Sequence, residues 1–229
     1  MSPITRNLEE VNRRIAAAAH RAGRDPGEVR LVAVSKKVDL ERIRQAVAAG
    51  HRLFGENYLQ EAKTKIPALG PGLSWHLVGS LQTNKAKGAV ELFDLIHAAD
   101  RQRLVQALDQ AAAAFGKIQD LLIQVNLAGE ETKSGAAPEE VPELLREVTR
   151  LPHLRVLGLM TMPPWFDDPE KVRPYFRELR ELRDRLRRLV GLPLTELSMG
   201  MSGDYEAAVE EGATLVRVGT AIFGARPGP

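Results

Sequence analysis

The feature of this 229-residue chain that most limits its fold is a regular alternation of strand patterns and helix patterns. Eight short runs rich in apolar and β-branched residues predict strands, at residues 30–35, 52–56, 75–79, 94–98, 120–126, 155–160, 195–199 and 214–218. Seven amphipathic stretches predict helices, at residues 40–49, 58–66, 83–92, 101–115, 138–150, 169–190 and 203–211. One more helix is expected over roughly the first twenty residues, where apolar side chains recur every three or four positions.

This alternation predicts an α/β fold, a single (β/α)8 barrel domain over residues 1–229 with an extra N-terminal helix. Barrels of this kind run from roughly 200 to 250 residues, which agrees with the length of the chain. A doubly wound parallel sheet is the alternative. Asp168 and Pro169 are placed to begin the long helix that follows them, and Ser202 is a candidate N-cap for the helix at 203–211.

Charge and composition exclude several classes of function. The chain has 32 basic and 30 acidic side chains, so its net charge of +2 does not favour a nucleic-acid partner. It has no cysteine, which excludes disulfides and thiolate metal sites, and we expect no metal. No apolar run is long enough to span a bilayer, and the N-terminus has no apolar signal-peptide core. We therefore expect a cytoplasmic protein without a membrane partner, and a monomer.

Polar residues are concentrated directly after the predicted strands, whereas the loops that precede the strands show no such concentration. In a parallel barrel these positions gather on one face, where ligand sites lie. The residues at this face are Ser35, Lys36, Lys37, Glu56, Asn57, His76, Gly79, Ser80, Gln82, Asn84, Lys85, Asn126, Lys133, Ser134, Gly135, Met160, Thr161, Ser198, Met199, Gly200, Ser202, Arg217, Gly219 and Thr220.

Lys36 follows the first predicted strand, an apolar β-branched run at residues 31–34. Partial desolvation at such a position lowers the pKa of an amine, and a neutral amine can attack an aldehyde to form a Schiff base. A solvated lysine in an ordinary loop is the alternative.

The loops after the last two strands carry the small residues of a phosphate site. Residues 197–204 read Leu-Ser-Met-Gly-Met-Ser-Gly-Asp, and residues 215–224 read Leu-Val-Arg-Val-Gly-Thr-Ala-Ile-Phe-Gly. Glycine lets the backbone approach a phosphate, and Ser202 or Thr220 would add a hydroxyl. Ordinary turn chemistry is the alternative for either loop, but the pair favours a phosphate cup.

Arg217 lies within the last predicted strand, on the same face as Gly219. A buried guanidinium needs hydrogen-bond acceptors, which either Glu56 or a ligand could supply. A ring nitrogen beside Arg217 would stay unprotonated, because a second positive charge there is unfavourable. Lys36, the cup and Arg217 together describe a ligand such as pyridoxal 5′-phosphate (PLP), among several phosphorylated aldehydes and sugars.

Seven segments in chain order resemble the pyridoxal phosphate homeostasis proteins, single-domain relatives of the N-terminal barrel of alanine racemase. The segments are Ala-Val-Ser-Lys (33–36), Phe-Gly-Glu-Asn-Tyr-x-Gln-Glu (54–61), Trp-His-x-x-Gly-x-Leu-Gln-x-Asn-Lys (75–85), Lys-Ser-Gly (133–135), Gly-Leu-Met-x-Met (158–162), Leu-Ser-Met-Gly-Met-Ser-x-Asp (197–204) and Val-Arg-Val-Gly-Thr-Ala-Ile-Phe-Gly (216–224). The chain departs from the family pattern at Lys37-Val38-Asp39, where many relatives carry Thr-Lys-Pro, and at Tyr205, where methionine is frequent.

The resemblance implies a barrel like PLP fold-type III, with PLP held as a Schiff base on Lys36. It implies that Arg217 faces the pyridine nitrogen and that the cup binds the phosphate. The cofactor-binding residues expected on this basis are Lys36, Asn57, His76, Met199, Ser202, Arg217, Gly219 and Thr220.

Three functions are open at this point. The first is a carrier or regulator of intracellular PLP (vitamin B6 homeostasis), which would hold PLP for PLP-dependent apo-enzymes and have no catalytic residues. The second is a PLP-dependent amino-acid racemase, which needs a second base opposite Lys36; in the racemases that the chain resembles, a second domain supplies that base. The third is an aldolase that uses Lys36 on a sugar phosphate. We expect the carrier. Tyr205 is the residue that could support the racemase instead, by reaching the open face of the cofactor.

Overall fold

Eight parallel strands close into a barrel in the computed structural model, which describes residues 2–130 and 134–225. The strands are β1 (Arg30–Val34), β2 (Leu53–Glu56), β3 (Ser74–Leu77), β4 (Leu95–Ala99), β5 (Gln119–Val125), β6 (Leu154–Thr161), β7 (Glu196–Ser198) and β8 (Leu215–Val218). Each strand pairs with the next one along the chain, and β8 pairs with β1 to close the barrel, with Arg217 opposite Val32. The predicted (β/α)8 barrel is confirmed, and the doubly wound sheet is excluded.

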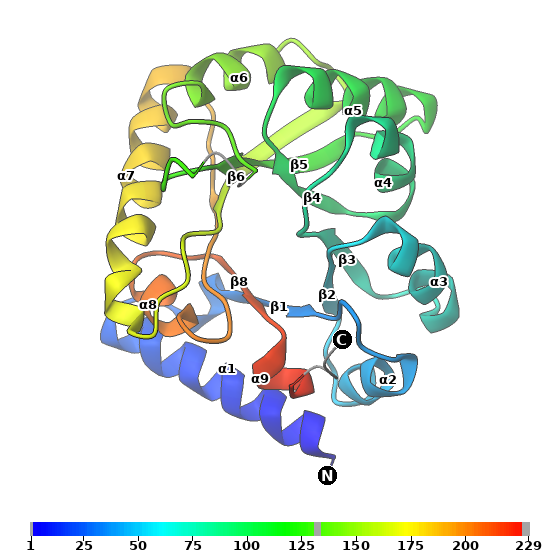
Figure 1. Cartoon of the computed structure of the whole chain (residues 1–229), viewed down its shortest axis with the longest axis vertical. Coiled ribbons are helices and arrows are strands. Elements are labelled where there is room, and N and C mark those ends of the chain that lie inside the picture. The colour runs from blue at the N-terminus through cyan, green and yellow to red at the C-terminus, as the bar shows by residue number, and fades with distance from the viewer. Residues whose placement is uncertain (1, 131–133, 226–229) are drawn as a thin grey trace.

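Helices surround the barrel and follow the strands in turn (Figure 1). They are α1 (Pro3–Arg21), α2 (Leu40–Ala48), α3 (Leu59–Leu69), α4 (Ala86–Leu92), α5 (Gln102–Ala114), α6 (Val141–Val148), α7 (Arg173–Val190), α8 (Tyr205–Glu210) and α9 (Thr220–Phe223). The predicted N-terminal helix is α1, and it packs against α2, α8 and α9. No helix in the described ranges combines the length and the apolar character needed to cross a lipid bilayer.

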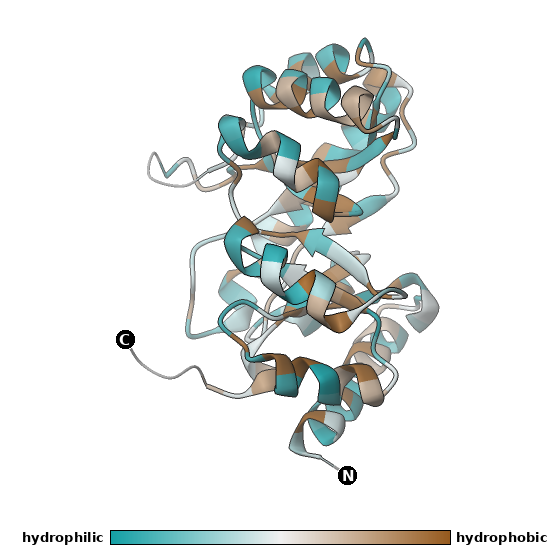
Figure 2. Cartoon of the chain, turned by 90° about the vertical axis from the view of Figure 1, so that its right-hand side faces the viewer, coloured by the Kyte–Doolittle hydropathy of each residue, from teal (hydrophilic) through white to brown (hydrophobic). Residues whose placement is uncertain are grey.

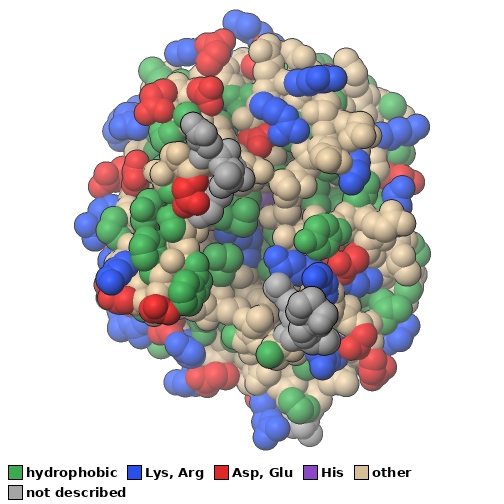
Figure 3. Space-filling view, in the orientation of Figure 1, with side chains coloured by type: hydrophobic (Ala, Val, Ile, Leu, Met, Phe, Trp, Pro, Cys, Tyr) green, Lys and Arg blue, Asp and Glu red, His purple; other side chains and the backbone are tan. Residues whose placement is uncertain are grey.

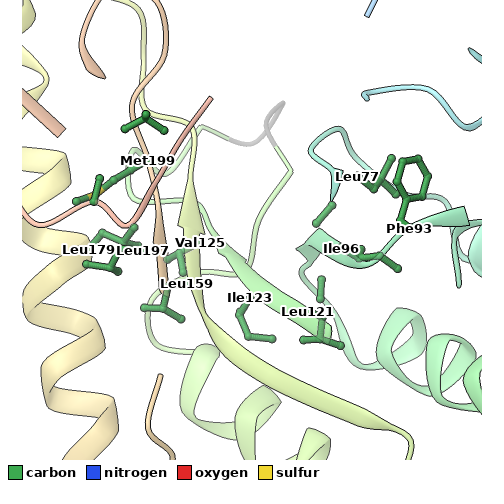
Figure 4. Close-up of a cluster of buried hydrophobic side chains, with 14 of the residues drawn as sticks. Leu77, Phe93, Ile96, Leu121, Ile123, Val125, Leu159, Leu179, Leu197 and Met199 are labelled. Carbon is green, nitrogen blue, oxygen red and sulfur yellow. The ribbon is translucent and has the colours of Figure 1, made fainter. Parts of the chain in front are cut away.

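Apolar side chains form two layers. The larger layer lies between the strands and the helices, and includes Phe93, Ile96, Leu121 and Leu197 (Figure 4). The smaller layer fills the barrel interior and consists of Val32, Val34, Val78, Leu95, Leu122, Met160 and Leu215. The helices accordingly show both hydrophobic and hydrophilic residues, as amphipathic helices at a surface do (Figure 2).

Three predicted helix starts differ from the structure. The helix expected from residue 83 begins at Ala86, after a 3₁₀ turn at Thr83–Lys85. The helix expected from residue 138 begins at Val141, with Pro142 in its first turn. The helix expected from residue 169 begins at Arg173, because Asp168 caps a separate 3₁₀ turn at Pro169–Lys171. In each case a turn with helical signals precedes the α-helix, and the sequence pattern does not separate the two.

Candidate functional site

A cavity of about 490 Å³ opens at the carboxyl ends of the strands. Its lining residues are Val34, Lys36, Asn57, Val78, Met162, Trp165, Met201, Ser202, Gly203, Arg217, Gly219 and Thr220. Figure 3 shows this face hollowed near its centre, with Lys and Arg side chains inside and beside the hollow. Six of the eight predicted cofactor-binding residues therefore meet in one cavity: Lys36, Asn57, Ser202, Arg217, Gly219 and Thr220.

Lys36 lies in the turn that follows β1, where it is half-buried and lines the cavity. Its neighbour Lys37 is exposed and does not line the cavity. The backbone of Lys37 adopts a left-handed conformation with φ of 58°, and its N–H donates to the carboxylate of Glu61 at 2.8 Å. This tight turn separates the two lysines, so that one of them is presented to the cavity.

A largely buried ion cluster, here called the outer cluster, holds the backbone around Lys36. It consists of Ser35, Glu56, Glu61 and Lys65. The Lys65 ammonium on α3 donates to the Ser35 carbonyl at 2.7 Å, to Glu56 at 2.9 Å and to Glu61 at 2.6 Å. The Ser35 hydroxyl also donates to Glu56, at 2.7 Å. Ser35 and Lys37, which flank Lys36, are thus hydrogen-bonded to α3, through Lys65 and Glu61 respectively.

The two carboxylates of the outer cluster have opposite pKa shifts. Burial raises the pKa of Glu56, against the opposing effect of Lys65. Burial also acts to raise the pKa of Glu61, but hydrogen bonds from Lys65 and from the Lys37 N–H outweigh it and lower the pKa. Lys65 is therefore the cation on which both carboxylates depend.

Arg217 projects from β8 to the floor of the cavity, with 4% of its surface exposed. Its guanidinium donates to the Ser198 hydroxyl at 2.5 Å and to the Thr161 carbonyl at 2.8 Å. The alternative that Glu56 is its acceptor is wrong, because Glu56 pairs with Lys65 in the outer cluster. Burial lowers the pKa of Arg217 to about 10, partly opposed by Asp204, so the guanidinium remains charged at neutral pH.

The loops after β7 and β8 meet at the side of the cavity. The Ser202 hydroxyl accepts from the N–H groups of Gly219 and Ala221, at 3.3 and 3.4 Å. Gly200 makes the approach possible, because it has a φ of 90° and an added Cβ would lie 2.5 Å from Cβ of Ala208. The hydroxyls and backbone N–H groups that could bind a phosphate are therefore brought together. The N-cap prediction for Ser202 is wrong, since α8 begins at Tyr205 with Asp204 at the N-cap position.

Two predicted residues, Met199 and His76, do not line the cavity. Met199 is fully buried in the apolar layer between strands and helices (Figure 4), because Ser198 beside it faces the barrel interior and side chains alternate along a strand. His76 is 4% exposed and points into the barrel, where Nδ1 lies 3.1 Å from Nε2 of His97.

Met162 and Trp165 line the cavity but were not predicted as site residues. They belong to the segment after β6, and Trp165 is 76% exposed. Their position after a strand was the signal that could have identified them. Lys133, which the sequence places near this face, lies outside the described residues.

Tyr205 does not reach the cavity. It is 2% exposed, its ring lies 5.5 Å from the Arg14 guanidinium, and it lines a neighbouring pocket instead. The ionisable side chains among the described lining residues are Lys36 and Arg217. In the described parts of the chain, no group of three or more His, Cys, Asp or Glu side chains could hold a metal ion.

Comparison with known sequences identifies relatives over nearly the full chain. The family described as alanine racemase, N-terminal domain, matches residues 6–227. The pyridoxal phosphate homeostasis protein of Aquifex aeolicus is 48% identical over 220 residues, which are 96% of each chain. The protein of the same name from Pseudomonas aeruginosa is 46% identical and covers 99% of this chain and 97% of its own.

Solved structures with this fold include PipY of Synechococcus elongatus with PLP bound. It has a TM-score of 0.86 at 39% identity, and the match covers 96% of this chain and 100% of PipY. An alanine racemase of Clostridium difficile shares the fold, with a TM-score of 0.76 at 14% identity, over 100% of this chain and 58% of the racemase. The chain therefore belongs to the alanine racemase N-terminal domain family and, within it, to the pyridoxal phosphate homeostasis proteins.

Proposed function

We propose that this protein binds PLP in the cavity and keeps the cofactor available for other proteins, without turning over a substrate. The observation that carries the proposal is the meeting of three groups in one cavity: the Lys36 amine, the Arg217 guanidinium and the cup of Ser202, Gly219 and Thr220. The names of the relatives and the PLP bound to PipY support it.

The donor set of the cavity fits the chemistry of PLP. The cup offers two hydroxyls and adjacent backbone N–H groups, which suit a phosphate. Arg217 would face the ring nitrogen and keep it unprotonated. The apolar side chains of Met162 and Trp165 would lie against the ring. PLP supplies an aldehyde, and the Lys36 amine would bond to its carbon as water leaves, forming a Schiff base.

The lining also supports a role without turnover. Racemisation, decarboxylation and transamination all move protons at a substrate carbon, and racemisation needs bases on two opposite faces. Lys36 could serve one face, but the other ionisable side chain in the described lining is Arg217, which stays protonated. An unprotonated ring nitrogen is also a weak electron sink, which disfavours carbanion chemistry.

The test of PLP binding is an absorbance spectrum of the purified protein before and after borohydride, followed by peptide mass mapping. Borohydride should fix one pyridoxyl group on Lys36, and Lys36→Ala should be colourless and folded. Lys37→Ala is the matched control and should keep the label on Lys36. A pyridoxyl group on Lys37 or Lys85 in the unaltered protein would overturn the assignment.

Absence of turnover is tested by α-proton exchange of L- and D-alanine in deuterated water with the PLP-loaded protein. We expect no exchange beyond that of PLP alone. Exchange near a typical enzymatic rate of ~10 per second, lost in Lys36→Ala, would establish an enzyme instead.

We further propose that the chain acts as a monomeric, single-domain carrier in the cytoplasm that passes PLP to apo-enzymes. The large apolar side chains exposed on the described surface support a monomer, because they come singly or in pairs from separate segments of the chain: Tyr58, Phe115 and Ile118, Met162 and Trp165, and Leu189. Light scattering after gel filtration should give a mass near 25.2 kDa. A mass twice as large at micromolar concentration would exclude the monomer.

A further inference from the structure

Four buried polar side chains form a continuous hydrogen-bonded chain through the barrel interior, here called the inner chain: Arg217, Ser198, His97 and His76. Arg217 Nη1 lies 2.5 Å from Ser198 Oγ, Ser198 Oγ lies 2.9 Å from His97 Nδ1, and His97 Nε2 lies 3.1 Å from His76 Nδ1. Each side chain is at most 4% exposed. The four side chains come from β8, β7, β4 and β3, so the inner chain crosses the barrel beneath the cavity.

All four side chains point inward, as the alternation along each strand requires. The residues on either side of His97, Ile96 and Ala98, pack in the outer apolar layer, and so do Val216 and Val218 beside Arg217. Polar groups in this position are costly unless they are hydrogen-bonded. The inner chain hydrogen-bonds them to one another, and the cavity lies above its Arg217 end.

Both histidines are neutral at neutral pH. Burial lowers the pKa of His76 to about 4, and burial lowers the pKa of His97 well below its ordinary value, with His76 and Arg217 adding to the effect. A neutral imidazole has one N–H donor and one acceptor nitrogen. Each histidine can therefore receive one hydrogen bond in the inner chain and donate one.

The direction of the inner chain follows from Arg217, because a guanidinium only donates. Ser198 Oγ accepts from Arg217, and its own hydrogen then points to Nδ1 of His97, its other neighbour. His97 must carry its hydrogen on Nε2 and donate to Nδ1 of His76, which leaves the hydrogen of His76 on Nε2. Reversing the Ser198–His97 link would leave the Ser198 hydroxyl hydrogen without an acceptor in the inner chain. Reversing the His97–His76 link alone would set two N–H groups against each other.

We infer that Ser198, His97 and His76 are positioning residues that fix the Arg217 guanidinium at the cavity floor, aimed at the ring nitrogen of PLP. This inference rests on the proposed function. A serine hydroxyl alone can rotate, but the histidines hold its hydrogen away from Arg217 and keep its lone pair toward the guanidinium. A carboxylate acceptor would also hold Arg217, but it would neutralise the charge that the cavity presents. The neutral chain orients the cation and leaves its charge for the ligand.

The first test reads the tautomers directly in the PLP-free protein by long-range ¹H–¹⁵N NMR of the histidine rings. We expect His97 and His76 to be protonated on Nε2 and to show no titration between pH 6 and pH 8. An Nδ1–H tautomer of His97, or titration of either ring in this range, would overturn the inferred direction. This result does not depend on PLP binding.

The second test compares His97→Gln with His97→Leu. Glutamine can accept from Ser198 with its carbonyl and donate to His76 with its amide, whereas leucine fills similar space and does neither. His97→Leu should weaken PLP binding about tenfold, the effect of one charge-assisted hydrogen bond, and should make the absorbance depend on pH near neutrality. His97→Gln should keep the PLP affinity within about threefold of that of the unaltered protein. Its absorbance should show the same pH profile as the unaltered protein.

Unfolding temperatures of the two variants, measured without PLP, separate loss of positioning from loss of fold. Equal PLP affinities and equal pH profiles for the two variants would overturn the positioning role. If the unaltered protein itself did not bind PLP, the proposed function would fail, whereas the NMR result would still decide whether the inner chain has the inferred direction.

Discussion

The inner chain is buried and the outer cluster is largely buried, but they balance charge in opposite ways. The inner chain joins one cation, Arg217, to neutral acceptors and neutral histidines. The outer cluster joins one cation, Lys65, to two carboxylates and a backbone carbonyl. One network therefore presents a positive charge to the cavity, whereas the other pairs its cation with carboxylates.

The difference assigns the two networks separate tasks. The outer cluster ties the turn after β1 to α3 and holds Ser35 and Lys37, which flank Lys36. It sets the position of the reactive amine and contributes to stability. The inner chain sets the orientation of a charge that the ligand uses. Changes in the outer cluster should chiefly affect stability, and changes in the inner chain should chiefly affect ligand binding.

The largest expected effect comes from removing the cation of the outer cluster. Lys65→Met would leave Glu56 and Glu61 without their shared partner, and one oxygen of Glu56 is already buried without a hydrogen bond. Removing one partner of a buried ion pair costs about 3–5 kcal/mol. Urea unfolding followed by circular dichroism should show a loss near 3 kcal/mol, because Glu56 can take up a proton.

The matched control for this variant is Lys63→Met, which changes an exposed lysine on the same helix. It should shift the unfolding free energy by less than about 0.5 kcal/mol. A similarly small shift for Lys65→Met would remove the distinction between the two networks.

The inner chain should make the stability of the fold fall as the pH is lowered. The pKa of His76 is about 4 in the folded protein because of burial, against about 6.5 when unfolded. A base with a depressed pKa contributes stability that is present above pH 6.5 and is lost as the pH falls toward 4. The loss attributable to His76 approaches about 3 kcal/mol at pH 4.

The acid effect is measured by urea unfolding at pH 7, 5 and 4. His76→Gln should reduce the dependence of stability on pH, and His20→Gln, which changes an exposed histidine of α1, is the matched control. An unchanged slope in His76→Gln would mean that His76 is not the neutral end of the inner chain.

A smaller effect is expected at the phosphate cup, which neither network contacts through a hydrogen bond within the described residues. Thr220→Ala removes a hydroxyl from the cavity wall, and a hydrogen bond to a charged group is worth about 1.5–3 kcal/mol. PLP affinity should fall about tenfold or more, with unchanged stability. Pyridoxal without the phosphate should bind poorly to the unaltered protein, and equal affinity for pyridoxal and PLP would show that the cup is misplaced.

The fold was predictable because its signals are local. Buried parallel strands read as apolar β-branched runs, and every predicted strand lies within two residues of its observed ends. The cavity was largely predictable too, since the residues that follow parallel strands gather on one face. Met199 does not line the cavity because its side chain faces outward, away from the barrel interior. His76 faces inward but lies within the barrel beneath the cavity, a depth that position along a strand does not give.

The two networks could not be read from the sequence, because their members are distant along the chain. Arg217 donates to residues 19 and 56 positions away, and His97 lies 101 positions from Ser198. Polar residues at inward strand positions, such as His97 and Ser198, were the available signal. Choosing their partners required the register of the closed barrel, which periodicity does not give.

Removing the cation of the inner chain separates the two cations most directly, because only a small change in stability is expected. Arg217→Met removes hydrogen bonds to Ser198 and Thr161, each worth about 1.5–3 kcal/mol for a charged donor. It also removes a buried charge whose pKa falls to about 10, which relieves about 3 kcal/mol. The two effects nearly cancel, so we expect a loss of about 1 kcal/mol by urea unfolding, with PLP affinity at least tenfold weaker. A loss of stability larger than that of Lys65→Met would reverse the comparison, because the fold would then depend more on the uncompensated cation than on the compensated one.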